Sequence, residues 1–446
     1  MTSPTAIDDP LDPTDPEDGG SDTKESAALA WPERRPGEHF PVVGVGAASG
    51  GFEAFLELLQ ALPADLGMAI VFISHLSDGR DDDLVRAFTQ RTQLTVQLVT
   101  EPTPIAPDHL YVMPHGTYLS SRDWSLVPDP LDPGYEDYSP IDHFLGSLAA
   151  DIESCAIAVL LSGGGVDGTL GVREVKAVGG ITIAQEPESA RNDAMPRAAI
   201  TTGAVDLILP PQQIAEELQR IGRHPYVRQP PQRRGGGDEL VIHPEQMHRI
   251  FTMLRSTSGV DFTHYKPPTI RRRLHRRMVL HKIDSVDLYI KYLRETPDEV
   301  GKLYRDLLIH VTRFFRDPES FKALTAEVFP HILRDTGTSS PIRIWLPGCS
   351  TGEEAYSIAI LLQEQMEKFK QNFAVQVFAT DIDSRAIASA RTGLFPASTI
   401  GDLTPQRLAR FFTIEPDGAN YRVNKTIRDM LIFSEHSLPY GDGQGK

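Results

Sequence analysis

The chain has 446 residues, of which 40% are hydrophobic and 24% charged, and its formal net charge is −17. The length predicts two or three domains, and the acidic balance argues against general nucleic-acid binding. No apolar run approaches the roughly 20 residues of a membrane helix, and the N-terminus lacks the pattern of a secretory signal. Cys155 and Cys349 stand in different segments without a CxxC pattern. We therefore expect a cytoplasmic protein without a metal site.

The hydrophobic pattern predicts five segments in chain order. Residues 1–39 are rich in Asp, Pro, Gly and Ser, which is typical of a disordered acidic tail. Residues 40–222 alternate buried-strand runs with helical patterns, which predicts an α/β domain with a doubly wound, mainly parallel sheet. A Pro- and Gly-rich linker at 223–239 precedes an all-helical domain at 240–335. Residues 341–446 begin a partial Rossmann-like domain, so the fold class is α/β, with an all-helical domain between the two α/β domains.

Polar residues follow three strands of the first predicted sheet. Ser49 lies on a glycine-flanked turn after the first strand, His75 follows MAIVFIS, and Asp167 lies in a glycine-rich loop after AIAVLLS. Ligands bind at the carboxyl edge of such sheets. Serine, histidine and aspartate are the parts of a nucleophilic triad, in which Ser49 attacks, His75 accepts its proton and Asp167 orients the imidazole. The alternative is that Ser49 and Asp167 cap helices and His75 only ends a strand.

The segment from residue 342 to residue 390 predicts the ligand of the last domain. A strand, a small-residue turn, a helix and a second strand ending at Asp381 form the nucleotide-binding half of a doubly wound sheet. Glu353 and Glu354 open the helix and would repel a diphosphate there. S-adenosylmethionine, with ribose and a cationic group, therefore fits better than a dinucleotide, and a nicotinamide dehydrogenase is the disfavoured alternative. Asp381 is placed to bind ribose hydroxyls, and Cys349 fills the turn.

Residues 41–210 resemble the catalytic domain of CheB-type chemotaxis protein-glutamate methylesterases. The resemblance is carried by VVGVGAASGGFEAF, IVFISHLSDG and VLLSGGGVDGTLGVREVKAVGG, and it implies His75 as the general base with Asp167 as its orienting acid. The family pattern Gly-Ala-Ser-x-Gly-Gly places its serine where this chain has Ala48, so Ser49 is shifted by one residue. Because attack tolerates errors of only about 1 Å, we expect a weakened or inactive esterase on an intact scaffold, unless the turn adjusts to present Ser49.

Residues 240–436 resemble CheR-type chemoreceptor glutamate methyltransferases in DFTHYKPPTIRRRLHRRM, LLIHVTRFFRDPESF and VFATDIDSRAIASAR. The resemblance implies a fusion that removes and adds methyl groups on receptor glutamates. His310 stands where some members have asparagine, and core packing is the alternative for the aromatic part of VTRFFRD. A non-catalytic scaffold that binds receptor or regulatory partners is the rival function, which Ala48 favours. The resemblance implies that S-adenosylmethionine is contacted by Thr312, Arg316, Glu353 and Asp381.

One helical segment is strongly basic and contains no acid. Because receptor methylation regions are acidic helices, we expect this segment to dock on them. A solvated helix is the simpler alternative, and nucleic-acid binding is disfavoured because aromatic residues do not interleave the bases. The bases are Lys266, Arg271, Arg272, Arg273, Arg276, Arg277 and Lys282.

The sequence ends at Lys446, shortly after the predicted strand MLIFSEH. The methyltransferase fold needs further strands, and half a sheet would leave an unpaired edge and an uncovered face. We therefore expect weak or no methyltransferase activity from the chain as given.

Overall fold

The computed structural model describes residues 40–74, 81–131, 138–224, 242–308, 312–335, 341–370, 373–401, 403–416, 418 and 420–437. Residues 1–36 and 37–446 are two separate units. The predicted acidic tail, most of the predicted linker, His75 and His310 lie outside the described residues.

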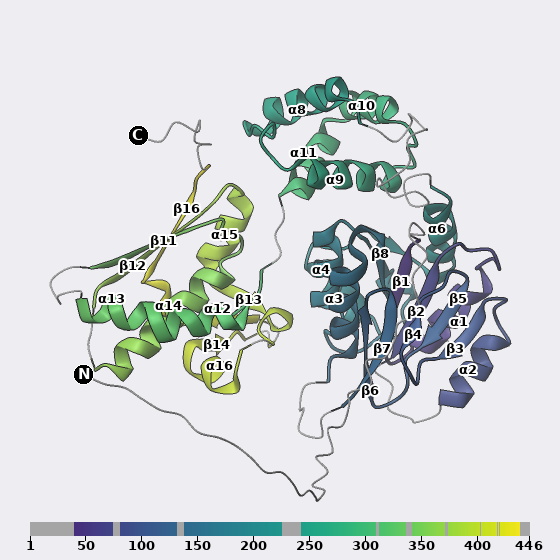
Figure 1. Cartoon of the computed structure of the whole chain (residues 1–446), viewed down its shortest axis with the longest axis horizontal. Coiled ribbons are helices and arrows are strands. Elements are labelled where there is room, and N and C mark those ends of the chain that lie inside the picture. The colour runs from purple at the N-terminus through teal and green to yellow at the C-terminus, as the bar shows by residue number, and fades with distance from the viewer. Residues whose placement is uncertain are drawn as a thin grey trace, which may run out of the picture. The chain divides into compact units, whose positions relative to one another are not determined.

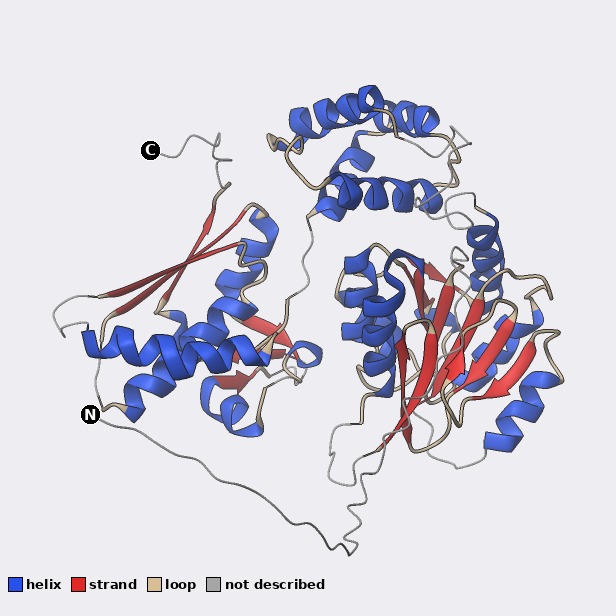
Figure 2. Cartoon of the chain, viewed as in Figure 1, coloured by secondary structure: helices blue, strands red, loops and turns tan. Residues whose placement is uncertain are grey.

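A seven-stranded sheet organises the first domain, as Figures 1 and 2 show. Its strand order is β10-β9-β8-β1-β2-β5-β3, and neighbouring strands pair in parallel throughout. The predicted doubly wound parallel sheet is therefore confirmed. The strands are β1 (Val42–Ala47), β2 (Ala69–Ser74), β3 (Thr95–Leu98), β5 (His109–Val112), β8 (Ala156–Leu160), β9 (Ile181–Gln185) and β10 (Leu207–Leu209).

Helices cover both faces of this sheet, which explains why its central strands are apolar at successive positions. Val43 and Val45 pack into one buried cluster with α1, α2 and α6, whereas Val42 packs into another with α3, α4 and α5. The first group is α1 (Gly51–Gln60), α2 (Asp81–Thr89) and α6 (Pro211–Arg223), and the second is α3 (Pro140–Ile152), α4 (Thr169–Val178) and α5 (Ala194–Thr201). Short helical turns η1 (Glu153–Cys155) and η2 (Pro187–Ser189) follow α3 and β9.

A small antiparallel sheet in the first domain was not predicted from the sequence. It consists of β4 (Thr103–Pro104), β7 (Ser125–Pro130) and β6 (Thr117–Arg122), in that order. The β6–β7 hairpin turns at Asp123 and Trp124, which both have positive φ. Such a two-residue turn matches the twist of a hairpin but normally carries Asn or Gly, so this sequence gives little sign of it.

The predicted helical domain is also present. Three of its four main helices begin with proline, whose fixed φ suits the first helical position. Ile250, Leu274, Tyr289 and Leu303 lie in its buried core. The helices are α8 (Pro244–Ser258), α9 (Pro267–Leu280), α10 (Val286–Glu295) and α11 (Pro297–Leu307).

The last domain contains the predicted strand–turn–helix–strand unit. Its parallel sheet has the order β11-β12-β16, and a second, antiparallel sheet has the order β13-β15-β14. The strands are β11 (Ile342–Pro347), β12 (Val375–Asp381), β13 (Leu394–Pro396), β14 (Phe412–Ile414), β15 (Asn420–Val423) and β16 (Leu431–Glu435). The helices are α12 (Pro318–Ala323), the π-helical η4 (Leu324–Val328), α13 (Phe329–Asp335), α14 (Glu353–Lys368), α15 (Ser384–Thr392), η5 (Ala397–Thr399), α16 (Pro405–Phe411) and α17 (Lys425–Arg428).

The two faces of the β11-β12-β16 sheet differ. Val377, Ala379 and Phe433 face the buried core with α14. On the other face, Trp345, Phe378 and Ile432 align across the three strands, and Trp345 is 54% exposed. Within the described residues, this row of apolar side chains is therefore only partly covered.

Candidate esterase and methyl-transfer sites

The register of the first sheet brings the predicted triad positions to one edge. Ala47, the last residue of β1, lies opposite Ser74, the residue before His75. Gly46 lies opposite Leu160, the last residue of β8, which leads toward Asp167. Because parallel strands end at the same edge, the ends of β1, β2 and β8, which precede Ser49, His75 and Asp167 in the chain, lie side by side. His75 itself lies outside the described residues.

The turn after β1 presents Ser49 and hides Ala48. Ser49 is exposed, whereas Ala48 is buried, and the amide of Ala48 donates to the carbonyl of Ser162 at 3.1 Å. A Cβ added to Gly163 would lie 2.9 Å from the Ala48 Cβ, so the Ala48 side chain faces the glycine loop after β8. Gly50 takes a left-handed φ of 79° at the start of α1, which glycine adopts without strain. The two side chains therefore project differently.

Ser162 is a residue of this site that sequence reasoning missed. Its buried hydroxyl donates to the Ser49 carbonyl at 3.0 Å and accepts the Asn192 amide at 2.9 Å, and its own amide donates to Gln185 Oε1 at 2.8 Å. It therefore ties the serine turn to the ends of β8 and β9. The available sequence signal was a serine directly after a buried strand and before three glycines.

Asp167 is buried and binds the amino end of α3. Its two carboxylate oxygens accept backbone N–H groups from Ile141 at 3.1 Å and Asp142 at 2.9 Å. This is the helix-capping role that the sequence left open, although the cap is on a helix earlier in the chain. Because each carboxylate oxygen has a second lone pair, the contacts leave Asp167 able to accept a further hydrogen bond.

The turn after β11 holds the last domain's polar residues close to a strand end. Gly352 has φ 100° immediately before α14, a conformation that favours glycine. Cys349 is buried and its amide donates to the Thr380 carbonyl at 3.0 Å. Burial, with the charge of Asp381, raises the pKa of the Cys349 thiol to about 12. Cys349 is therefore a neutral filler of the turn, as predicted.

Asp381 organises this turn through its carboxylate. One oxygen accepts the Ser350 amide and the other accepts the Asp383 amide, at 2.8 and 2.9 Å. Glu353 is also buried, accepts the Thr351 hydroxyl at 2.6 Å and lies 3.8 Å from Arg173. Asp381 and Glu353 therefore both help to hold this turn in place through hydrogen bonds.

A cavity of about 350 Å³ opens beside the same turn, within the usual size range of small-molecule sites. Thr312, Arg316, Ser350 and Glu354 are among its lining residues, whereas Glu353 and Asp381 are not. The structure thus brings together Thr312 and Arg316 of the predicted set, and Asp381 is joined to the cavity through Ser350. Phe314, in contrast, packs in the core against Phe395 and Phe412, as the core-packing alternative predicted.

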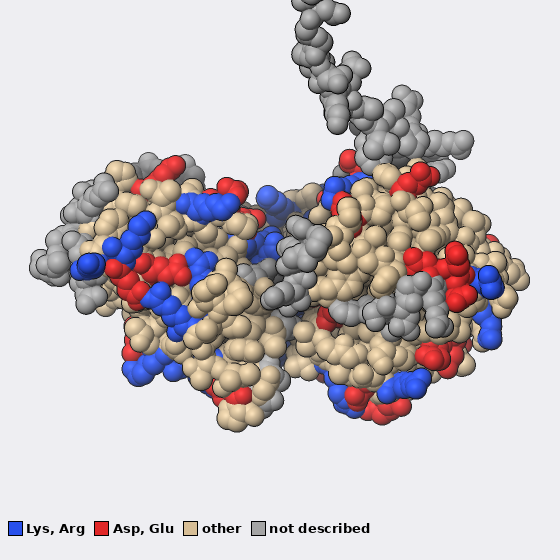
Figure 3. All heavy atoms as spheres, turned by 90° about the horizontal axis from the view of Figure 1, so that it is seen from below, with Lys and Arg blue, Asp and Glu red and all other residues tan. Residues whose placement is uncertain are grey.

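Three of the seven bases expected to form a docking surface are buried, so the expectation is wrong for those three. Arg273, Arg276 and Arg277 are buried, whereas Lys266 and Arg271 are exposed. The carboxylates that balance the buried bases come from elsewhere in the chain. Figure 3 draws the opposite side of the molecule from α9, and basic and acidic side chains are intermixed on that face.

The described part of the chain contains no cluster of His, Cys, Asp or Glu suited to a metal ion. Among its helices, none combines the length and apolar character needed to cross a membrane.

Comparison with known families assigns each domain. Residues 43–218 match the CheB methylesterase family model, 245–308 the all-alpha domain of CheR methyltransferases and 310–442 their SAM binding domain. A solved CheB methylesterase catalytic domain from Thermotoga maritima aligns with 27% identity and a TM-score of 0.39, over 98% of its length and 41% of this chain.

Relatives match both halves of the chain. An uncharacterized 104.1 kDa protein of Rhodobacter capsulatus is 35% identical over 366 residues, covering 78% of this chain and 38% of that protein. A protein-glutamate methylesterase/protein-glutamine glutaminase of Rhizobium meliloti is 33% identical, covering 41% of this chain and 52% of that protein. This chain thus spans less than two thirds of either relative.

A third relative covers the second half. Chemotaxis protein methyltransferase 2 of Vibrio cholerae is 30% identical over 203 residues, which are 45% of this chain and 69% of that protein. Together with the SAM binding domain match, this indicates S-adenosylmethionine as the cofactor. The chain therefore belongs to the CheR family of chemotaxis methyltransferases and carries a CheB methylesterase domain ahead of its CheR domains.

Proposed function

We propose that this protein works in the cytoplasm on methyl-accepting chemoreceptors or related signalling proteins, adding methyl groups to acidic helices with one module and removing them with the other. The observation that carries the proposal is the presence of both modules in one chain. Each module also has polar residues at the carboxyl edge of a parallel sheet, where ligands bind.

The first module would hydrolyse glutamyl methyl esters. In this mechanism Ser49 Oγ attacks the ester carbon, His75 takes its proton and returns it to the departing methanol, and Asp167 orients the imidazole. Water then cleaves the acyl-serine and releases the glutamate carboxylate and a proton. The support for Ser49 is its exposure on the turn that Ser162 ties down. The buried Ala48 at the family's serine position argues for a low rate.

The second module would hold S-adenosylmethionine, which supplies the methyl group when bound. Thr312, Arg316 and Glu353 are proposed contacts, with Asp381 at the ribose hydroxyls. Thr312 and Arg316 of this set line the cavity, which also offers the carboxylate of Glu354, so it has a cation and an anion for the charged ends of the ligand. A receptor glutamate is already ionised near neutral pH, so the residues only need to position the two partners and exclude water.

Calorimetry with the whole chain tests the second module. We expect S-adenosylmethionine to bind, with affinity falling at least about tenfold in both Arg316→Met and Asp381→Asn, because each removes a charged hydrogen-bonding group. Asp429→Asn, on an exposed acid that pairs with Lys425, is the matched control and should bind like the parent chain. Binding of NAD without binding of S-adenosylmethionine would contradict the proposal.

A non-catalytic scaffold is the second candidate, and Ala48 is the observation that favours it. The two candidates can be distinguished with a cytoplasmic fragment of the receptor whose glutamates carry labelled methyl esters. The catalytic proposal expects methanol release above the rate without protein, and transfer of labelled methyl groups from S-adenosylmethionine. Receptor binding with neither reaction would support the scaffold instead.

A further inference from the structure

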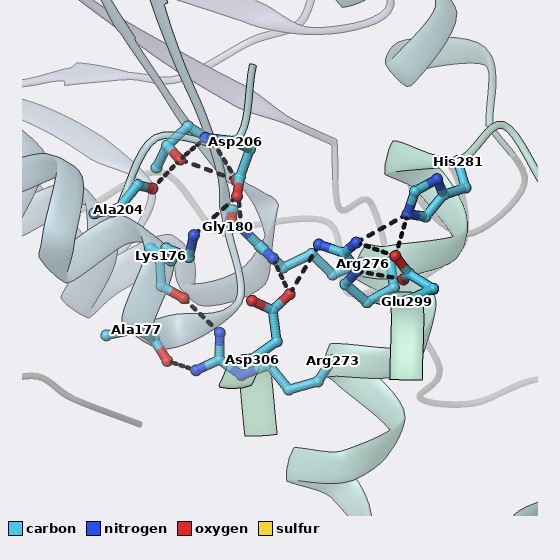
Figure 4. Close-up of polar contacts among 12 residues, drawn as sticks. Lys176, Ala177, Gly180, Ala204, Asp206, Arg273, Arg276, His281, Glu299 and Asp306 are labelled. Atoms are coloured by element: carbon cyan, nitrogen blue, oxygen red, sulfur yellow. Dashed lines mark hydrogen bonds and ion pairs between the residues drawn. The ribbon is translucent and has the colours of Figure 1, made fainter. Parts of the chain in front are cut away.

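Helix α9 of the helical domain lies against the esterase domain through buried guanidinium groups, as Figure 4 shows. Arg276 is only 1% exposed although arginine is almost never fully buried without partners. Its Nε donates to the Gly180 carbonyl at 2.8 Å, and its two Nη atoms pair with Asp206 and Asp306. Gly180 and Asp206 belong to the esterase domain, so Arg276 bridges the two domains.

Asp206 is prepared for this bridge within the esterase domain. Lys176 Nζ lies 3.1 Å from one of its oxygens, and the Thr182 amide donates to the other at 3.0 Å. Burial alone would raise the pKa of Asp206, but the charges of Arg276 and Lys176 lower it to about 2. The Asp206 carboxylate is therefore ionised, and these contacts fix its orientation where it meets the Arg276 guanidinium.

Arg273 binds another part of the esterase surface, the carbonyl end of α4. Its two Nη atoms donate to the carbonyls of Lys176 and Ala177, in the last turn of α4. The Lys176 carbonyl also accepts the amide of the C-cap residue Gly179 at 3.1 Å. The negative end of the helix dipole lies at these carbonyls, which favours a cation there. Burial and the neighbouring Arg276 lower the pKa of Arg273 to about 10, which still leaves it charged near neutral pH.

Apolar and peripheral contacts extend the surface along α6. Val279 of α9 is buried in the esterase core cluster that also contains Leu218 and Ile221. At the margin, His224 Nε2 lies 3.3 Å from the Ile283 carbonyl and 3.1 Å from Asp284. The interface thus has a buried centre with paired charges and a more polar margin, an arrangement found in specific interfaces.

We propose that α9 is a docking helix whose partner is the esterase domain of the same chain, and that this contact holds the two domains together without the linker. The partner surface consists of the carbonyl end of α4, Gly180 and Asp206. Separation would expose Val279 to water, which disfavours it. The charges would be solvated on separation, so their pairing makes the contact specific more than it makes it tight. Arg273 and Arg276 are then unavailable to receptor, whatever reactions the two modules carry out.

The test uses the whole chain with a site for a sequence-specific protease inserted between residues 225 and 241. After cleavage, we expect the two pieces to elute together in gel filtration at micromolar concentration. Arg276→Gln should weaken their association at least about a hundredfold, because breaking a buried ion pair leaves a buried charge unpaired. Val279→Asp should weaken the association of the two pieces by a similar factor, because it places a charge among the apolar side chains of the interface.

Arg271→Gln is the matched control on the same helix, since Arg271 is exposed. It should change the association by less than about threefold. Circular dichroism of the cleaved pieces establishes that each remains folded. Folded wild-type pieces that separate after cleavage, or equal effects of Arg271→Gln and Arg276→Gln, would overturn the proposal. The readout is association, so it is independent of esterase or methyltransferase activity.

Discussion

The side chain of Asp142, in α3, binds the amino end of α4, and the side chain of Asp167, just before α4, binds the amino end of α3. Asp167, just before α4, accepts backbone N–H groups of α3, including that of Asp142 at 2.9 Å. Asp142, in the first turn of α3, accepts the Gly171 amide of α4 at 2.8 Å. The predicted triad acid is therefore also part of the joint between α3 and α4.

This exchange predicts a pH dependence of stability. Burial, together with the negative charge of Asp167, raises the pKa of Asp142 from 3.8 to about 8. Asp142 therefore stays protonated to a higher pH in the folded state than in the unfolded chain. The stability that this difference contributes is complete below pH 3.8 and is lost as the pH rises toward 8. Urea unfolding from pH 4 upward should show it. Asp142→Asn should flatten the decline, whereas Asp65→Asn, on an exposed acid, should leave it unchanged. An unaltered slope in Asp142→Asn would refute the assignment.

The buried hydroxyl of Ser162 predicts a second outcome. Ser162→Ala leaves the Asn192 amide without its acceptor and the Ser49 carbonyl without its donor. We expect a loss of about 1–3 kcal/mol in the free energy of unfolding, the usual penalty of an unsatisfied buried group. Ser49→Ala, at an exposed position, should change it by less than about 0.5 kcal/mol. Chemical denaturation measures both, and similar values for the two variants would count against the role of Ser162.

A buried network in the helical domain predicts acid sensitivity. Glu299 accepts hydrogen bonds from Arg277, His281 and Tyr289. Burial would raise the pKa of Glu299, but His281 and Arg277 lower it to about 2. Its stabilising contribution is therefore present above the ordinary value of 4.5 and is lost as the pH falls toward 2.

Glu299→Gln should lower the free energy of unfolding by about 3–5 kcal/mol at neutral pH, because the buried Arg277 loses the carboxylate that it binds through two nitrogens and is left with that of Asp306, at 3.5 Å. The acid sensitivity of this domain should also diminish. Glu295→Gln, on an exposed acid paired with Lys291, provides the comparison and should stay within about 0.5 kcal/mol of the parent chain. Thermal melts between pH 3 and pH 7 give the measurement.

Ala48→Ser tests the shifted serine directly. If Ala48 limits hydrolysis, this variant should release methanol from methylated receptor at least about a hundredfold faster than the parent chain, since a triad member is worth more than that in serine hydrolases. The gain should disappear when His75→Ala is added. Parent activity that is already high and is abolished by Ser49→Ala would show instead that Ser49 serves as the nucleophile.

Periodicity predicted the central elements well because their burial is local in sequence. The strands around Val43 and Val71, and the helices α8 to α11, follow from apolar spacing and starting prolines. The β6–β7 hairpin escaped because its turn at Asp123 and Trp124 lacks the usual Asn or Gly.

The site was harder to predict because its decisive contacts join distant segments. Ser162 meets Ser49 across 113 residues, and Arg276 meets Asp206 across 70. A run of bases without a nearby acid suggested an open surface, yet the neutralising carboxylates are distant in sequence: Asp206 lies in the esterase domain, and Glu299 and Asp306 lie on α11. Single-sequence patterns do not record such pairings, so burial of charged residues is where sequence reasoning was weakest.

The shortness of α4 has a consequence for how this chain can vary. Its ten residues span about 15 Å, with Gly171 held near one end by Asp142 and the carbonyls of Lys176 and Ala177 held at the other by Arg273. One inserted residue would rotate the far end by about 100° and swing those carbonyls away from the arginine. The linker can lengthen or shrink without altering this fit, but the helix must keep its length, which makes it a rigid spacer between the contact with Asp142 and the surface that α9 binds.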